Sequence, residues 1–377
     1  MIYLGMDFGT TNSCIYVAND SDIPKPMLKE RCMPSVLCEK IEGGKPIRYY
    51  GADALGEFDK DVKFFSNLKL SLRDKANRGK FNSKRGWQYY RNGRALSGQE
   101  YNKKELVKDF IKHLLNKAGI KFGEDSITYG DRESAALKNV KITMGYPVFH
   151  DLTQRDAYHD FFREILIEIG FKKDNILFET EPCLAAYGLA RGCDNDITVG
   201  DRILIFDCGG GTTDVSILTM EEGGGYSVVE CEGCQYAGVA IDKALFGYIK
   251  KISGQECSMD FINKVFNGKT DIDIKYLESI RKLKESASLN PNEIITKGDL
   301  EYSNELGLDF TDFRFADFYN SDFWDDVIKK ILKPLNAVIQ RASSTKRHKI
   351  KNFYLAGGSS AMPKIRDTLS KILNEHK

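Results

Sequence analysis

The stretch that most constrains the fold is residues 203–218. Four apolar residues are followed by Asp207, and three glycines and two threonines then precede a second extended segment. This pattern predicts a β-hairpin with a glycine-rich tip. Glycine has no Cβ, so its backbone can turn tightly and approach a ligand closely. Successive N–H groups exposed at such a tip form a cradle for anions, phosphate above all, and the aspartates beside it suit a hydrated divalent cation.

A near copy of this stretch lies at residues 2–17. There a strand-forming segment again ends in an aspartate, Asp7, and Gly9, Thr10 and Thr11 follow it. One such tip is weak evidence, because many ordinary hairpins have glycine and aspartate at their turns. Two copies with the order Asp-x-Gly…Thr-Thr favour a duplicated architecture over an ordinary hairpin. We therefore expect two loops that face one polyphosphate.

Length and composition indicate a globular protein with two lobes. The chain has 377 residues, which is enough for two hydrophobic cores. Its net charge of +1 gives no general attraction to nucleic acid or to an anionic membrane, so no partner of either kind is expected. No apolar stretch is long enough to span a bilayer, and the N-terminus lacks the basic and apolar regions of a signal peptide.

The cysteines favour a reducing compartment. The chain has nine cysteines, an odd number, and they are dispersed along the sequence. This indicates free thiols and hence a cytoplasmic location. Cys231 and Cys234 have C-x-x-C spacing, but no second such pair or close histidine pair completes a zinc site. We interpret these two residues as thiols near a turn. The five histidines are scattered and match no metal or triad pattern.

Hairpins and helices recur in both halves, which predicts an α/β fold. Apolar residues at helical spacing mark a helix at 105–117, and Gly119 follows where a helix stop belongs. Asp151 or Thr153 is the candidate N-cap of a helix that runs to residue 169. Further helices are predicted at 184–190, 242–251, 274–289 and 324–342 (kinked at Pro334), and further strands at 140–144, 176–178, 352–356 and as a pair within 290–315.

Four segments carry a resemblance to a known family: residues 7–13, 206–216, 356–360 and 181–189. The first three resemble the phosphate loops and adenosine turn of the actin-like ATPase superfamily. With the fourth, which is similar to a helix that connects two lobes, the chain looks like the nucleotide-binding domain of the 70-kDa heat-shock (DnaK-type) chaperones. The resemblance covers essentially the whole chain. Residues 145–148 look more like those of divergent DnaK-related proteins.

The resemblance implies a two-lobed actin-like ATPase (ribonuclease H-like) fold with a central nucleotide cleft. Lobe I would comprise residues 1–190, with an inserted subdomain at about 36–115. Lobe II would comprise residues 191–377, with an inserted subdomain at about 243–317. No Ser/Gly linker separates the halves, so they should share the cleft. The family's peptide-binding domain is not expected in this chain.

The resemblance also implies a role for each matching residue. Asp7 and Asp207 would hold Mg²⁺ through its waters, which suits an ion that dehydrates reluctantly. Lys69 would stabilise charge on the transferring phosphoryl group, and Glu181 and Asp207 would orient the attacking water. The expected catalytic residues are therefore Lys69, Glu181, Asp207 and Asp7. The expected phosphate-binding residues are Gly9, Thr10, Thr11, Asn12, Gly209, Gly210, Gly211, Thr212 and Gly238. The expected nucleoside contacts are Arg281, Lys284, Ser288, Gly357, Gly358, Ser359 and Met362.

Two further pairs match regulatory positions of the family. Pro147 and Arg155 match a proline and an arginine that relay the nucleotide state to the domain surface. Gly238 and Asp242 match the loop that senses the γ-phosphate.

The positions around the adenine depart from the family pattern. The family often stacks adenine between two arginines, whereas the aligned residues here are Glu285 and Ala361. Arg281 falls where the family often has glutamate. The loss of both cation–π partners, each worth about 0.5–2 kcal/mol, should weaken ATP binding relative to the main chaperones or relax the choice of base.

The function implied by the resemblance is that of a slow ATPase domain of a DnaK-like chaperone, whose lobes close on Mg-ATP. The expected ligands are ATP or ADP and Mg²⁺, with K⁺ as a second cation. The expected partners are the nucleotide and a co-chaperone or nucleotide-exchange factor, and the chain should be monomeric.

Two other functions stay open. An actin-type filament or scaffold would use the nucleotide to tune assembly, and sedimentation with and without ATP separates it from the ATPase module. A small-molecule kinase is less favoured, because no acceptor-binding motif is visible. Residues 267–270 end like a P-loop but lack its upstream glycine, and the basic, turn-rich residues 73–103 are interpreted as a solvated insertion.

Overall fold

The computed structural model describes residues 1–20, 25–57, 62–66, 68–69, 88–91, 94–95, 103–129, 133–149, 151–192, 197–255, 274–301, 303, 307–344 and 350–374. The α/β class expected from the sequence is confirmed. The chain divides into two compact units, the first Met1–Asn92 with Leu96–Glu181 and the second Gly93–Ala95 with Pro182–Lys377. The P-loop-like residues 267–270 and most of the basic stretch 73–103 lie outside the described residues.

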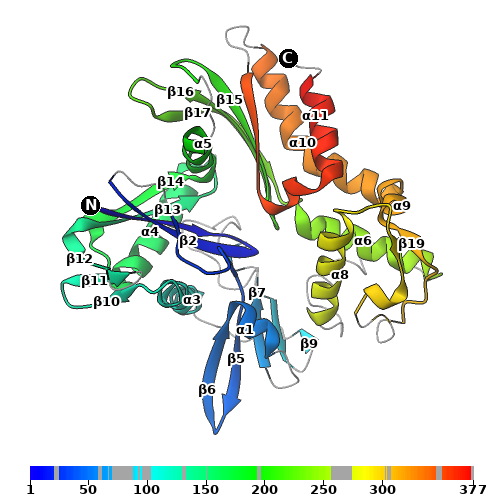
Figure 1. The fold of residues 1–377 in the computed structure, drawn as a ribbon, viewed down its shortest axis with the longest axis horizontal. Helices are drawn as coiled ribbons and strands as arrows, with labels where there is room; N and C mark the ends of the chain where they lie inside the picture. The colour runs from blue at the N-terminus through cyan, green and yellow to red at the C-terminus, as the bar shows by residue number, and fades with distance from the viewer. Residues whose placement is uncertain are drawn as a thin grey trace. The chain divides into compact units, whose positions relative to one another are not determined.

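The main sheet of the first unit is built around the N-terminal hairpin (Figure 1). Its order is β14-β13-β1-β2-β3, and β4 also pairs with β2. β1 and β2 are antiparallel, whereas β13 runs parallel to both β1 and β14. The strands are β1 (Ile2–Phe8), β2 (Asn12–Asn19), β3 (Lys25–Pro26), β4 (Met33–Pro34), β13 (Val140–Tyr146) and β14 (Ile176–Thr180).

The alternation of side chains along β1 decides where its aspartate points. Leu4, Met6 and Phe8 are buried, whereas Tyr3 and Asp7 are exposed. Because successive residues of a strand face opposite sides of the sheet, the apolar residues of β1 enter the core. The carboxylate of Asp7 is thereby left on the face away from that core.

Two helices pack on the core side of this sheet. They are α3 (Lys103–Lys117) and α4 (Leu152–Ile169), both close to their predicted bounds. The predicted cap of α4 is confirmed, since the carboxylate of Asp151 accepts a hydrogen bond from the Thr153 N–H at 2.8 Å. The ring of Phe8 meets Phe110 of α3 at 5.8 Å and Phe162 of α4 at 5.6 Å between centroids. These contacts anchor the end of β1 that carries Asp7.

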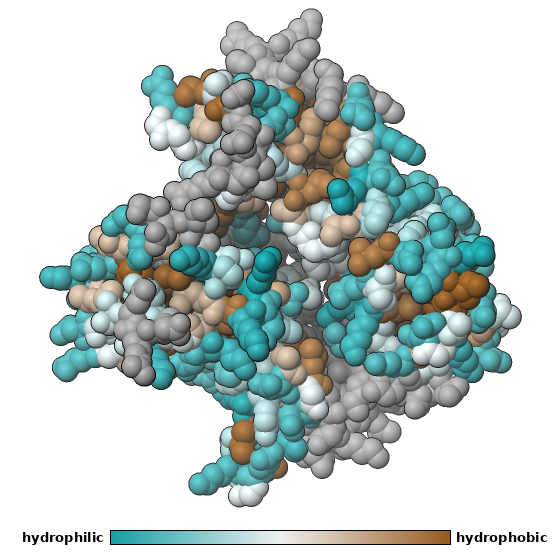
Figure 2. All heavy atoms as spheres, viewed as in Figure 1, coloured by the Kyte–Doolittle hydropathy of each residue, from teal (hydrophilic) through white to brown (hydrophobic). Residues whose placement is uncertain are grey.

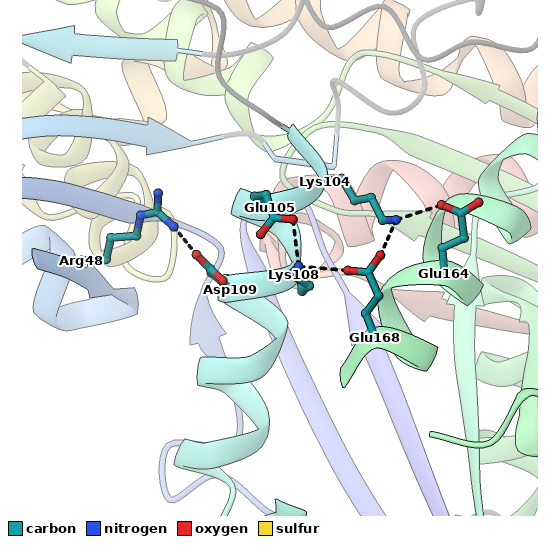
Figure 3. Close-up of polar contacts among 7 residues, drawn as sticks. All are labelled: Arg48, Lys104, Glu105, Lys108, Asp109, Glu164 and Glu168. Atoms are coloured by element: carbon teal, nitrogen blue, oxygen red, sulfur yellow. Dashed lines mark hydrogen bonds and ion pairs between the residues drawn. The ribbon is translucent and has the colours of Figure 1, made fainter. Parts of the chain in front are cut away.

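An ion-pair network joins α3 to its neighbours (Figure 3). The amino groups of Lys104 and Lys108 lie 2.6 and 2.9 Å from the carboxylate of Glu168 on α4. Hydrogen bonds from both lysines lower the pKa of Glu168 to about 2. Arg48 of β6 (Lys45–Tyr50) pairs with Asp109 of α3. Together these pairs fix the helix that supports Phe8.

The other elements of the first unit are short. β5 (Leu37–Glu42) pairs with β6 and β7 (Val62–Ser66), and β7 pairs with β8 (Gln88–Arg91). β10 (Lys121–Phe122), β11 (Ser126–Tyr129) and β12 (Glu133–Ala136) form a small meander. The remaining ones are α1 (Gly51–Gly56) and the 3₁₀ turns η2 (Leu137–Asn139) and η3 (Lys173–Asn175). The inserted subdomain expected at about 36–115 stays a prediction.

The sheet of the second unit repeats the scheme of the first (Figure 1). Its order is β17-β16-β15-β20, with β15 and β16 antiparallel and β20 parallel to β15. The antiparallel hairpin with a parallel neighbour thus occurs in both units, as β2-β1-β13 and as β16-β15-β20. The strands are β15 (Arg202–Cys208), β16 (Thr213–Met220), β17 (Tyr226–Cys234) and β20 (Ile350–Ala356).

Helices cover this second sheet. α10 (Asp322–Ser344) packs on β16, β17 and α6 (Gly238–Ile252), and it continues through Pro334. α5 (Glu181–Gly192) contributes Cys183 and Ala186 to a core with Ile203 and Ile205 of β15. The unit division lies at the start of α5, a little before the boundary expected near residue 190. The remaining elements are β9 (Arg94–Ala95), α8 (Ile274–Ala287), β18 (Ile294–Ile295), η4 (Lys297–Asp299), β19 (Phe313–Arg314), α9 (Phe315–Tyr319), η5 (Gly358–Ala361) and α11 (Pro363–Asn374).

One prediction on local structure needs correction, and another is confirmed. α6 begins at Gly238 rather than at residue 242, because its first turn is held by hydrogen bonds to the Gly209–Gly210 backbone that no local pattern reveals. The strand pair expected within 290–315 is present, as the short antiparallel strands β18 and β19.

On the face shown in Figure 2, hydrophilic residues predominate among the coloured atoms, and hydrophobic residues form separate patches. Large apolar side chains with high exposure, such as Leu289 at 69% and Val199 at 60%, are scattered along the sequence. No helix in the described ranges is long and apolar enough to cross a bilayer.

Candidate functional site

The two predicted hairpins have the same register. In the first, Asp7 lies opposite Cys14, and the last pair before the loop is Phe8 with Ser13. In the second, Asp207 lies opposite Asp214, and the last pair joins residues 208 and 213. Each hairpin therefore has a four-residue loop that begins two residues after its aspartate. The expected phosphate-binding residues at the two loops are Gly9, Thr10, Thr11, Asn12, Gly209, Gly210, Gly211 and Thr212.

The glycine that opens each loop meets different surroundings. A Cβ added at Gly9 would overlap the carbonyl oxygen of Asn12, whereas one added at Gly209 would lie 3.7 Å from the carbonyl oxygen of Thr212. The second distance is ordinary van der Waals contact. Only the first loop therefore needs glycine at this position for steric reasons within the protein.

Replacing Gly9 by alanine is expected to destabilise the first unit by about 1–3 kcal/mol, the usual cost of overpacking. The matched Gly209→Ala change should alter the free energy of unfolding by less than about 1 kcal/mol. Urea unfolding of both variants, followed by circular dichroism, measures the difference. Equal losses for the two variants would contradict this account of the loops.

A buried ion pair lies in the first unit beside Asp7. Lys69 is only 6% exposed, and its amino group pairs with the carboxylate of Glu181 at the start of α5. Burial alone would lower the pKa of Lys69, but the charge of Glu181, with a smaller contribution from Asp7, outweighs it and raises the pKa above its ordinary value. The lysine therefore stays a cation. Two of the other expected catalytic residues, Glu181 and Asp7, thus lie within electrostatic reach of Lys69.

Cys14 lies next to this group on β2. Its thiol is half-buried, and burial first, then Asp7 and Cys32, raise the pKa of Cys14 to about 12. The side chain is therefore a neutral thiol near pH 7. Sequence reasoning did not single out this residue.

In the second unit, two separate segments brace the loop after β15. The N–H of Gly238, at the start of α6, donates to the carbonyl of Gly209 at 3.1 Å, and the Ser359 hydroxyl donates to the same carbonyl at 2.8 Å. The N–H of Cys208 donates to the Ser360 hydroxyl at 3.2 Å. The sequence-predicted residues Gly209, Gly238 and Ser359 are therefore brought together.

Close packing at Gly238 tightens this arrangement. A Cβ added there would lie 2.6 Å from the Ser359 hydroxyl and 3.3 Å from the Lys284 amino group. Lys284 also donates to the Gly238 carbonyl at 3.3 Å. The start of α6, the turn after β20 and α8 thus meet at the loop.

A buried charge cluster lies behind this loop. Lys284 pairs with Asp242 at 2.7 Å, and the two residues are 6% and 2% exposed. Arg281 lies 3.8 Å from Asp242 and pairs with Glu278 at 2.7 Å. Burial alone would lower the pKa of Arg281, but the charges of Glu278 and Asp242 outweigh it, so the pKa lies above its ordinary value. Glu278 was missed by sequence reasoning, although its i, i+3 spacing to Arg281 is a signal.

The other expected nucleoside residues also lie in the second unit. Ser288 is buried, and its hydroxyl donates to the Glu285 carbonyl at 3.3 Å. Glu285 and Ala361, the departures from the family pattern, are both exposed, whereas Met362 is buried. Gly357 adopts φ +79°, and a Cβ added there would overlap the carboxylate of Asp207. Gly358 has open space at its Cβ position.

The two expected relay residues lie in the first unit. Pro147 is buried directly after β13, and Arg155 lies on the first turns of α4. Arg155 forms an ion pair with its neighbour Asp156 at 2.8 Å. A relay between Pro147 and Arg155 stays a prediction.

The donor set fits a hydrated Mg²⁺ better than a metal held by protein alone. Among the described residues, no group of three or more His, Cys, Asp or Glu side chains could hold a metal ion directly. Asp7 and Asp207 each stand beside a loop of backbone N–H groups, and Mg²⁺ commonly keeps several waters and binds through few carboxylates and substrate phosphates. Each aspartate, taken within its own unit, therefore suits an ion that arrives with a polyphosphate.

The C-x-x-C pair is not a metal or disulfide site. Cys231 lies on strand β17, and Cys234 is the last residue of that strand, directly before the bend that leads to α6. Three residues of extended chain span about 10 Å, beyond the roughly 7 Å limit for bridged Cα atoms. Both thiols are free.

Comparisons with known proteins agree with the sequence pattern. A family model described as "Hsp70 protein" matches residues 100–377. The chaperone protein dnaK1 of Prochlorococcus marinus subsp. pastoris (strain CCMP1986 / NIES-2087 / MED4) is 25% identical over 283 residues, which are 73% of this chain and 37% of that relative. The matched chain thus spans well under half the length of this relative.

Proposed function

The chain belongs to the Hsp70 family, and we propose from this membership that it binds and slowly hydrolyses Mg-ATP as the nucleotide-binding domain of a DnaK-like chaperone. The observation that carries the proposal is the repeated hairpin. In each unit an aspartate stands two residues before a four-residue loop of the same register. We propose that both loops bind phosphates of one nucleotide.

The first unit supplies the charges for phosphoryl transfer in this proposal. Lys69 is a buried cation within electrostatic reach of Asp7, and a fixed positive charge stabilises the negative charge of the transferring group. Glu181, which pairs with Lys69, would accept a hydrogen bond from the attacking water. Mg²⁺, held through water by Asp7 and Asp207, would neutralise phosphate charge.

The second unit supplies the nucleoside site in this proposal. Lys284 and Ser288 would contact the nucleoside, with Gly357, Gly358 and Ser359 in the turn beside it. Arg281 is already paired with Glu278 and lies near Asp242, so it is poorly placed to stack on a base. This supports weak adenine binding, as do the exposed Glu285 and Ala361.

A phosphate-release assay tests the proposed activity. The 377-residue chain should release phosphate from ATP slowly and saturably, and chelation of Mg²⁺ should stop the release. GTP in the same assay tests the choice of base, and a KM for ATP well above that of a main DnaK-type chaperone is expected. Absence of release above the rate of a buffer blank would overturn the ATPase proposal. Nucleotide-dependent pelleting of the protein would favour a filament instead.

Lobe closure and partners belong to the same proposal. A γ-phosphate that touches both loops would favour a closed form over an open one, which is what a ligand needs to shift such an equilibrium. A co-chaperone or nucleotide-exchange factor would act on that equilibrium. A monomer is expected in solution, and sedimentation equilibrium measures it.

A further inference from the structure

One face of α3 is attached to the sheet that contains β5, β6 and β7. Asp109, His113 and Lys117 are spaced four residues apart, so they share this face of the helix. The carboxylate of Asp109 pairs with Arg48 of β6 (Figure 3). One turn further along α3, the ring of His113 stacks on Tyr50 of β6 with 4.3 Å between the centroids.

Arg48 connects α3 to the neighbouring strand of the sheet as well. Its guanidinium lies 3.2 Å from the carboxylate of Glu39, its partner across β5 and β6, and Glu39 is only 7% exposed. Burial alone would lower the pKa of Arg48, but the charges of Asp109 and Glu39 outweigh it and raise the pKa. One guanidinium thus joins β5, β6 and α3 through charge-assisted contacts, which are stronger and more directional than neutral ones.

His113 contributes through packing rather than through charge. Burial first, then the charge of Lys117, lowers the pKa of His113, so its imidazole is neutral near pH 7. Its plane lies 16° from that of Tyr50, a stacked arrangement. Lys117 adds an exposed ion pair with Asp53 of α1 at 3.9 Å, and such pairs are worth little. The helix therefore holds the sheet mainly through Asp109 and His113.

The same helix supports the strand that carries Asp7. Phe110, the residue after Asp109, packs on Phe8, and Phe8 directly follows Asp7. The sheet on the other face of α3 leads to Lys69, because β7 pairs with β5 and Lys69 lies three residues after the end of β7. The helix thus connects the strand that ends near Asp7 with the sheet that ends near Lys69.

We propose that Asp109 and His113, together with their partners on β6, are positioning residues that hold the Lys69 amino group at its working distance from Asp7. This role rests on the proposed function. Loss of these contacts should lower the turnover number for ATP by at least about tenfold, since a displacement of about 1 Å can cost about 10²-fold in rate. The affinity for Mg-ATP should change little, because neither side chain belongs to a phosphate loop.

Paired substitutions test the geometry at each position. Asp109→Ala removes the partner of Arg48, whereas Asp109→Asn keeps an oxygen that accepts a hydrogen bond. His113→Ala removes the stacked ring, whereas His113→Phe keeps an aromatic ring on Tyr50. Phosphate release and calorimetric titration with Mg-ATP give the turnover number and the dissociation constant of each variant. Both alanine variants should lose turnover at a nearly unchanged dissociation constant, and the asparagine and phenylalanine variants should regain part of it.

Lys108→Ala is the matched control on the same helix. Lys108 pairs with Glu168 of α4 at 2.9 Å rather than with the sheet, and Lys104 keeps its own contact with Glu168 at 2.6 Å (Figure 3). The turnover number of this variant should equal that of the unmodified protein. Equal losses of turnover in Lys108→Ala and Asp109→Ala would show that general loosening of α3 slows the reaction, and would overturn the positioning role.

Hydrogen exchange without nucleotide separates this inference from the proposed function. Asp109→Ala should speed exchange of the β5 and β6 amides at least about fivefold, whereas the β1 and β2 amides keep their rates. Unchanged exchange in β5 and β6, or faster exchange with unchanged turnover, would refute the inference while the ATPase proposal stands. A protein that hydrolyses no ATP would refute the ATPase proposal and the positioning role with it, and the exchange rates would still show whether Asp109 holds the sheet on α3.

Discussion

Replacing Lys69 by alanine is expected to lower the turnover number for ATP by about 10²–10³-fold, the usual cost of losing one preorganised electrostatic group. The side chain is 6% exposed, and the charges of Glu181 and Asp7 hold it as a cation. In the proposed mechanism this cation would act on charge that develops during phosphoryl transfer, more than on the bound nucleotide. ATP binding should therefore stay largely intact while turnover falls.

The variant needs a stability control, because Lys69 is also structural. Its loss leaves Glu181 without this cation, and breaking a fully buried pair costs about 3–5 kcal/mol. The cost here should be smaller, since the Glu181 side chain is 21% exposed. Lys69→Met, which keeps much of the apolar stem, serves as a second variant, and both are assayed below their melting temperatures.

Lys282→Ala is the matched control for a lysine outside the site. Lys282 is 68% exposed and pairs with the exposed Glu301 at 3.3 Å, an interaction worth at most about 1 kcal/mol. The turnover number of the Lys282→Ala variant should equal that of the unmodified protein. Unchanged turnover in folded Lys69→Ala and Lys69→Met would show that the lysine has no catalytic role.

Gly357→Ala is expected to destabilise the second unit by about 2–5 kcal/mol and to abolish detectable nucleotide binding. Gly357 adopts φ +79°, which costs an L-residue about 1–2 kcal/mol. A Cβ there would also overlap the Asp207 carboxylate and the backbone of Cys208, and overpacking adds about 1–3 kcal/mol. The backbone of Asp207 and Cys208 cannot shift easily, because both residues pair with β16 and Asp207 also pairs with β20.

The adjacent glycine provides the control. Gly358 has no atom within 4 Å of its Cβ position and no positive φ, so Gly358→Ala should unfold at nearly the same urea concentration as the unmodified protein. Circular dichroism against urea concentration gives both midpoints. Equal urea midpoints for Gly357→Ala and Gly358→Ala would contradict the close approach of this turn to Asp207.

The sequence predicted the features that depend on local pattern. The hairpins at Asp7 and Asp207 follow from strand-forming segments that end in an aspartate before a glycine-rich tip, and the structure has both in the same register. The cap of α4 follows from Asp151 before an amphipathic stretch. Each of these signals lies within a few residues of the feature that it predicts.

The features that the sequence did not predict depend on contacts between distant segments. The early start of α6 rests on its hydrogen bonds to the loop at Gly209 and Gly210. The pairing of Lys284 with Asp242 joins two helices that are distant in the sequence. The pattern of residues within one segment does not show which distant segment it will contact. The resemblance supplied roles for Lys69 and Glu181, but their ion pair appeared only with the structure.

The central claim is that the two hairpins bind one magnesium-bound nucleotide together. Isothermal titration calorimetry of ATP into the unmodified protein, Asp7→Asn and Asp207→Asn, with and without Mg²⁺, tests it most directly. The account predicts one ATP per chain, tighter binding with Mg²⁺, and weaker, less Mg²⁺-sensitive binding in both variants. Two nucleotides per chain, or full Mg²⁺-dependent affinity in either variant, would contradict it.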